Sequence, residues 1–248
     1  FDIHVTSTYL DMDDIVLLSQ INTLKKETST SEKLSLKASV QSHKGKINTI
    51  PYSELRTTLT YRQQTIDIST FEMNAFNGGF SGKGRIVFAP GGVAQYTIGF
   101  ILDKMSAEQI IKYAGSEKVS MTGTLTMKGD LTAEGANMSD LKKTMQGTAT
   151  LVMEKGSLNK YAVLSKVFSI LNVSQLLKFQ LPDMITEGMP FTSVKGTFSL
   201  QDGILSSNDL FVKSNAMNMS IVGRTDIIRD ELNLNIGIQP LQTVDKIV

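Results

Sequence analysis

The chain has 248 residues, 41% of them hydrophobic, and its 25 basic and 24 acidic side chains leave a net charge of +1. This balance gives no electrostatic reason to expect nucleic acid as a partner. The absence of cysteine excludes disulfides, thiolate nucleophiles and cysteine metal sites, and two histidines are too few for a histidine-rich metal cluster. Composition therefore disfavours most catalytic chemistry and is typical of a moderately apolar domain long enough to bury a core.

The two ends of the sequence indicate a piece of a longer protein. The sequence opens at Phe1 without an initiator methionine, a basic segment or an apolar leader, and it stops at Val248 without a closing turn or polar tail. We therefore expect an excised segment with no signal peptide. The most apolar stretch, residues 161–173, contains lysine, serine and asparagine and is too short to span a bilayer.

The first elements in chain order are a capped helix and a strand. Asp11, Asp13 and Asp14 precede a short apolar run and predict a helix start, because the stretch lacks the glycine and closing glutamate of a calcium loop. Residues 33–41 alternate between apolar and polar side chains, which is the period of a strand with one wet face. The next residues, 43–45, read His-Lys-Gly and predict a solvated turn.

A glycine-rich segment follows at residues 78–84 and resembles a phosphate-binding loop. However, Asn77 stands where that loop has its first glycine, and Gly84 stands where it has serine or threonine. Because strand patterns flank the segment on both sides, we interpret it as a hairpin turn. Pro90-Gly91-Gly92 predicts another turn.

An internal repeat is visible from here on. Each copy reads as a strand, a polar turn with glycine and a returning strand, and the copies cover residues 82–93, 123–131, 147–158 and 196–205. Two of the turns fall at 128–130 and 202–203. Short helices capped by Asp, Ser or Asn are predicted at 102–107 and 136–141. The pattern indicates a stack of hairpins with helical insertions rather than a strict solenoid.

The clearest predicted helix runs from Leu158 to Leu171, where apolar residues form one stripe. A second helical piece covers residues 175–180 before Leu181-Pro182 ends it. Alternating strands are predicted at 119–128, 215–221 and 231–239.

The predicted fold class is mainly β: a curved antiparallel sheet with a few amphipathic helices packed on its apolar face. The apolar residues of that face could fill a core between sheet and helices, which the pattern alone favours. They could also line an acyl-chain groove, a use for which flexible methionine is suited. The candidate lining residues are Met121, Leu125, Met127, Leu164, Phe168, Leu171, Phe198, Leu200, Met217, Met219, Ile221, Leu232, Leu234, Ile236 and Ile238.

No catalytic, metal or cofactor site is predicted. Asp226, Asp230 and Glu231 crowd one hairpin, as is typical of a solvated turn. Neither His4 nor His43 has neighbours suited to a catalytic triad. We therefore expect a protein that is not an enzyme.

The order of glycine, proline and apolar residues over nearly the whole chain resembles AsmA-like proteins of the Gram-negative envelope, above all their C-terminal region. The segments that carry the resemblance include Leu164-Ser-Lys-Val-Phe168, Leu181-Pro182, Gly188-Met-Pro-Phe191, Val194-Lys-Gly196, residues 198–204, Asn208-Asp-Leu210, Leu232-Asn-Leu234 and Gln239-Pro240. Upstream, residues 10–14, 78–84 and 135–147 fit the same pattern.

The resemblance implies one β-groove fragment over residues 1–248, with an upstream repeat region at 1–95 and the C-terminal AsmA-like region at 96–248. It implies a taco-like, apolar groove of the bridge-like lipid transfer type, located in the periplasm and anchored to the inner membrane in the full-length protein. Phospholipid would move by its acyl chains between the inner and outer membranes and support outer-membrane integrity. It implies no catalytic residues and no cofactor.

Two other interpretations stay open. One is a non-enzymatic scaffold or assembly factor for outer-membrane proteins, which would bind them through exposed strand edges. The other is an adhesin-like surface β-structure with a fully packed core.

Overall fold

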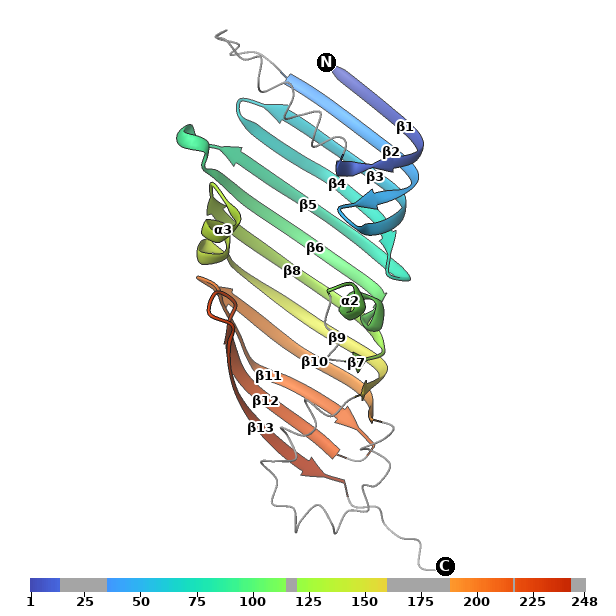
Figure 1. The fold of residues 1–248 in the computed structure, drawn as a ribbon, viewed down its shortest axis with the longest axis vertical. Coiled ribbons are helices and arrows are strands. Elements are labelled where there is room, and N and C mark those ends of the chain that lie inside the picture. The colour runs from blue at the N-terminus through green and yellow to red at the C-terminus, as the bar shows by residue number, and fades with distance from the viewer. Residues whose placement is uncertain (14–34, 115–119, 160–187, 216, 242–248) are drawn as a thin grey trace, which may run out of the picture. The chain divides into compact units, whose positions relative to one another are not determined.

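The computed structural model describes residues 1–13, 35–114, 120–159, 188–215 and 217–241 (Figure 1). In these residues the chain is mainly β, which confirms the predicted fold class. Twelve strands hydrogen-bond in the order β1-β2-β3-β4-β5-β6-β8-β9-β10-β11-β12-β13, and the short β7 pairs with β9. The sheet is largely antiparallel, and β1 pairs with β2 in parallel.

The elements have the following bounds. The strands are β1 (Asp2–Asp11), β2 (Ser35–Ile47), β3 (Ile50–Arg62), β4 (Thr65–Ala75), β5 (Gly78–Phe88), β6 (Ala94–Ser106), β7 (Ser120–Met121), β8 (Thr124–Gly135), β9 (Gln146–Asn159), β10 (Met189–Gln201), β11 (Ile204–Ser214), β12 (Met217–Asp226) and β13 (Glu231–Pro240). The helices within the described ranges are the 3-10 turn η1 (Pro90–Gly92), α2 (Ala107–Tyr113) and α3 (Met138–Thr144).

The chain divides into two compact units. The first contains residues 1–103 and 128–147, and the second contains residues 104–127 and 148–248. Each unit is described by itself below.

In the first unit, two-residue turns reverse the chain between long strands. Phe76 and Asn77 join β4 to β5 with φ values of 52° and 60°, which is the left-handed pairing of the tight hairpin turn. The turn predicted at residues 78–84 is wrong, because the reversal lies just before them and these residues form the start of β5. From Gly79–Asp103 to Phe88–Ala94, β5 pairs with β6 without a register shift.

The turn predicted at residues 43–45 is wrong, because they lie inside β2. Across the ladder, Glu54 adopts φ 54° and its carboxylate contacts the Nδ1 atom of His43. The aromatic ring of Tyr52 lies over Gly45, where a Cβ would overlap the Tyr52 hydroxyl and the carbonyl oxygen of Leu10. Glycine here permits a close approach within a sheet, which local sequence cannot distinguish from a reversal.

Two further predicted reversals are wrong. The segment at 128–130, in the first unit, lies inside β8, and Lys155 and Gly156 of the repeat copy at 147–158, in the second unit, lie inside β9. The copy at 196–205 is a hairpin of the predicted kind, and the copy at 82–93 also leads into a reversal, at the predicted turn 90–92 between β5 and β6. A Cβ on Gly156 would overlap the Phe191 ring, so this glycine again marks a close approach. In the confirmed hairpin, Asp202 and Gly203 turn with φ 51° and 78°.

Both short helices begin at a capping residue inside the predicted segments 102–107 and 136–141, although residues 102–106 themselves form the end of β6. The Ser106 hydroxyl accepts a hydrogen bond from the N–H of Gln109 at 3.4 Å, and the Asn137 side chain accepts one from the N–H of Asp140 at 3.0 Å. The helix predicted from Leu158 does not begin there, because β9 continues to Asn159 and pairs with β7. The remainder of that predicted helix lies outside the described residues.

The second unit has a buried core at one end of its strands. It contains Ala107, Met153, Met189, Phe191, Val212, Met217 and Met219. Half-buried apolar side chains pack against it from β7 to β13, namely Met121, Leu125, Leu151, Leu158, Val194, Ile221 and Ile238. Four of the seven buried positions are methionine, whose flexible side chain fills irregular spaces.

Candidate functional site

The register of β12 and β13 gathers apolar side chains on one face of the sheet. Residues directly opposite one another in an antiparallel ladder point to the same side. The pairs Met219–Ile238 and Ile221–Ile236 join two apolar residues each, whereas the intervening pair joins a serine, Ser220, to a glycine, Gly237. We name the side that carries Met219 and Ile238 the apolar face, and its opposite the polar face.

A β-bulge keeps β11 in phase with this face. Lys195 pairs with Phe211 and Ser199 with Ser206, so residues 196–198 of β10 lie opposite residues 207–210 of β11. The extra residue would leave a ladder N–H without a carbonyl partner, but the Asp209 carboxylate accepts a hydrogen bond from the N–H of Thr197 at 2.7 Å. Leu205 before the bulge and Val212 after it consequently share the apolar face, since they pair with Leu200 and Val194 of β10.

Asp209 is held ionised by the same contacts. The Thr197 hydroxyl and then the Thr197 N–H donate to its carboxylate, and these hydrogen bonds keep the pKa of Asp209 below its ordinary value. The ionised carboxylate of Asp209 therefore takes the place of a backbone carbonyl as the acceptor for the Thr197 N–H.

The predicted lining residues of the second unit fall into three degrees of burial. Met217 and Met219 belong to the buried core, whereas Leu232 and Leu234 at the other end of the face are exposed. The half-buried members are Met121, Leu125, Met127, Phe198, Leu200, Ile221, Ile236 and Ile238. Leu164, Phe168 and Leu171 lie outside the described residues. The apolar face thus opens towards solvent along β13.

The first unit has an apolar face of its own, which the candidate list omitted. Register places Phe71 of β4 opposite Gly82, and Gly82 opposite Phe100 of β6. The same face carries Leu59, Tyr61, Ile66, Ile68, Met73, Phe80, Ile86, Tyr96, Ile98 and Leu102. Phe71 and Phe80 meet edge to face with ring centroids 5.6 Å apart. The alternation of apolar and polar residues along β6 could have indicated this face. Gly99 and the apolar Ile101, which lie on the opposite face, interrupt that alternation.

The polar face of the first unit is charged and internally paired. Arg85 of β5 donates to the Asp67 carboxylate of β4 at 2.5 Å, and Arg56 lies opposite Glu72 in the β3–β4 ladder. Such exposed cross-strand pairs are typical of a solvated sheet surface.

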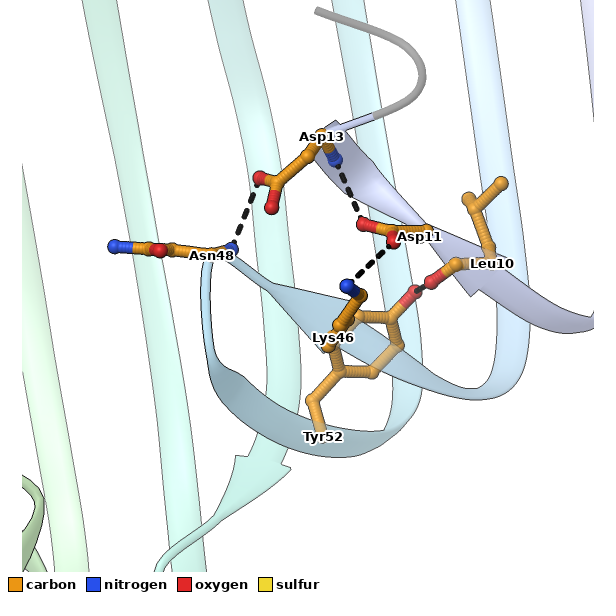
Figure 2. A network of polar contacts seen from close by, with 6 residues as sticks. All are labelled: Leu10, Asp11, Asp13, Lys46, Asn48 and Tyr52. Carbon is orange, nitrogen blue, oxygen red and sulfur yellow. Dashed lines mark hydrogen bonds and ion pairs between the residues drawn. The ribbon is translucent and has the colours of Figure 1, made fainter.

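A polar network fixes the end of β1 to the β2–β3 hairpin (Figure 2). Asp11 forms an ion pair with Lys46 at 2.9 Å, and its carboxylate also accepts a hydrogen bond from the N–H of Asp13 at 3.1 Å. The Asp13 carboxylate accepts one from the N–H of Asn48 at 3.0 Å, and the Tyr52 hydroxyl donates to the carbonyl of Leu10 at 2.8 Å. The contact with Lys46 lowers the pKa of Asp11, whereas burial raises the pKa of Tyr52.

These contacts give the acidic residues structural roles. Asp11 makes the backbone contact expected of a capping residue, and Asp14 lies outside the described residues. The cluster at the β12–β13 turn behaves similarly, because the Asp226 carboxylate accepts hydrogen bonds from the N–H groups of Ile228 and Arg229, at 2.9 and 3.0 Å. These bonds lower the pKa of Asp226 and shape the solvated turn that was predicted.

The described part of the chain offers little for metal chemistry or membrane insertion. It contains no group of three or more His, Asp or Glu side chains placed to hold a metal ion. None of its helices combines the length and the apolar composition needed to cross a bilayer.

Comparison with known proteins gives one match. A family model described as YhdP protein matches residues 2–244. Searches of curated proteins and of solved structures found no match. Because the matched range covers nearly the whole sequence, the chain belongs to the YhdP protein family, an AsmA-like family of bridge-like lipid transfer proteins.

Proposed function

We propose that this chain is a periplasmic segment of an inner-membrane-anchored protein that carries phospholipid along its apolar face between the inner and outer membranes. The observation that supports the proposal is the one-sidedness of the sheet: on the apolar face of each unit, most ladder pairs join two apolar residues or an apolar residue and glycine, with Leu232 opposite Thr225 as an exception. The family is one of transport proteins without known catalysis, which agrees with this use.

The chemistry of the face suits the movement of acyl chains. Apolar surface left in water costs about 25 cal/mol for each Å², and each CH₂ group buried returns about 0.8 kcal/mol. Leu232 and Leu234 are exposed on β13, so an acyl chain on this face would gain contacts that the protein does not supply itself. The side chains there are aliphatic and bear no hydrogen-bonding groups, so they would hold a tail without fixing its position.

Within this proposal the candidate residues take different parts. Leu232, Leu234 and Ile236 would contact acyl chains directly, because they are exposed or half-buried on the apolar face. Met217 and Met219 would support the face from within the core. The headgroup would stay in water beside the strands, which leaves the lipid species open.

Two substitutions with matched surroundings test the assignment. Leu234 on the apolar face is 43% exposed, and Val222 on the polar face of the adjacent strand is 44% exposed. The chain and its variants are purified under the same conditions, and bound phospholipid is quantified by mass spectrometry after solvent extraction. We expect Leu234→Glu to lower bound phospholipid severalfold and Val222→Glu to leave it unchanged. Equal retention or equal loss in the two variants would contradict the proposal.

A further inference from the structure

The polar face of the second unit contains a hollow of about 520 Å³ over β9 to β13. Its lining is Thr148, Thr197, Phe198, Ser199, Ser206, Ser207, Asn208, Val222, Gly223, Arg224, Asn233 and Asn235. Most of these residues carry hydroxyls and amides, while apolar atoms make up most of the surface that lines the hollow. Arg224 carries the one charge, and no carboxylate lines the hollow.

Register arranges the lining in a row across four strands. Ser199 pairs with Ser206, Ser206 pairs with Arg224, and Arg224 pairs with Asn233. A neighbouring pair, Val222–Asn235, lies one step further along β12 and β13 on the same face. Neighbouring strands are about 4.8 Å apart, so the row presents a polar group at a regular interval close to the length of one sugar ring.

The residue types depart from what a solvated sheet surface requires. Asparagine is depleted in strands, because its side chain competes for backbone hydrogen bonds, yet Asn208, Asn233 and Asn235 all occupy strand positions in this hollow. The polar face of the first unit uses cross-strand charge pairs such as Arg85–Asp67 instead. Asn74 of β4 and Asn218 of β12 also lie in strands, so it is the clustering of three asparagines in one hollow that distinguishes this surface.

Several of these groups are available to a ligand. The Thr197 and Ser207 hydroxyls are engaged by Asp209. In contrast, the side chains of Arg224, Asn233 and Asn235 make no hydrogen bond or ion pair with any residue that the structure describes. Val222 also lines the hollow and is 44% exposed, so it contributes an apolar surface beside these polar groups.

We propose that this hollow binds a neutral oligosaccharide that lies across β10 to β13. Each asparagine amide offers a donor and an acceptor, and the Arg224 guanidinium offers paired donors, which fit adjacent sugar hydroxyls; the apolar Val222 fits the C–H face of a sugar ring. The volume lies within the range of small-molecule sites. This site is separate from the proposed lipid function, because Arg224, Asn233 and Asn235 lie on the opposite face of the same strands, although Ser207 and Gly223 belong by register to the apolar face.

Binding of three soluble probes, cellotetraose, chitotetraose and maltotetraose, is measured by isothermal titration calorimetry with the purified chain. We expect at least one probe to bind. We expect the double variant Asn233→Ala/Asn235→Ala to bind that probe at least tenfold more weakly. Asn215→Ala, an exposed asparagine of the same unit outside the hollow, serves as the control and should bind normally. Failure of all three probes to bind, or unchanged binding by the double variant, would overturn the proposal.

A second pair of variants separates this site from the lipid face. Val222→Glu should abolish saccharide binding and keep its phospholipid, which also shows that the variant is folded. Leu234→Glu should lose bound phospholipid and keep saccharide binding. Loss of saccharide binding in Leu234→Glu with retention in Val222→Glu would place the sugar on the wrong face and refute the assignment, whatever the outcome for lipid.

Discussion

Gly45 shows how a single missing side chain determines the packing of a strand end. The Tyr52 ring crosses over it, and the Tyr52 hydroxyl reaches the carbonyl of Leu10 at 2.8 Å, beside the Asp11–Lys46 ion pair (Figure 2). Any Cβ at this position must displace either the ring or the backbone of β1. The close approach of β1 to the β2–β3 hairpin therefore depends on glycine.

We expect Gly45→Ala to destabilise the chain by about 1–3 kcal/mol, the usual cost of overpacking a well-fitted site. Gly99→Ala is the matched control in β6, because the nearest atoms to its new Cβ would be Lys83 carbons at 3.8 Å. Alanine there should be neutral or stabilise the strand by about 0.5–1 kcal/mol, since glycine is unfavourable in strands. Urea unfolding measures both variants, and equal stability of the two would contradict this account of the Tyr52 contact.

Alternation of apolar and polar residues predicted much of the sheet at the scale of elements. β2, β12 and β13 lie where the period of two placed them, because each strand has one apolar and one polar side. The helix caps at Ser106 and Asn137 were predictable because a cap is a local contact within one turn.

Two of the wrong turns have a related physical cause. Gly45 lets the Tyr52 ring of the adjacent strand reach across to Leu10 of β1, and Gly156 leaves room for the Phe191 ring of β10. Leu10 and Phe191 are distant in sequence from these glycines, so the local sequence does not show the contact and the same residues suggested a reversal. Bulges are hidden for the same reason: the pairing of Thr197 with Asp209 depends on which residues the ladder brings together.

The Asp209 bulge gives an element-scale prediction, because it keeps Leu205 and Val212 on one face. Hydrogen bonds from Thr197 lower the folded-state pKa of Asp209 below the unfolded value of about 3.9. The stabilisation from this carboxylate is therefore present above about pH 5 and is lost as the pH falls through 3.9 towards the folded-state value. We expect Asp209→Ala to be less stable than the parent chain at pH 7, with the gap narrowing as the pH falls to about 3.

Urea midpoints of the two proteins, measured across that pH range, test this reasoning. A gap that stays constant with pH would show that the Asp209 charge does not act in the bulge. A gap that widens in acid would contradict the sign of the pKa shift.

At the scale of the whole molecule, burial is incomplete. Among the described residues, thirteen apolar side chains are buried, whereas seventeen large apolar side chains are exposed. Each side chain of this size that stays fully in water lacks the stabilisation of about 1.5–3 kcal/mol that complete burial would give. If phospholipid covers part of this surface, as proposed, the bound lipid contributes to the stability of the folded chain.

We therefore expect lipid to raise the melting temperature of the delipidated chain. Diheptanoylphosphatidylcholine, kept below its micelle concentration, should stabilise by about 2.7 kcal/mol at a hundredfold excess over its dissociation constant. For a chain of this size that corresponds to roughly 5–10 °C in a calorimetric scan. Ile98 and Ile101 supply the control, because they lie on opposite faces of β6 with exposures of 38% and 40%. Ile98→Glu should reduce the lipid-induced shift and Ile101→Glu should preserve it, whereas an equal shift in both variants would mean that the lipid does not distinguish the two faces.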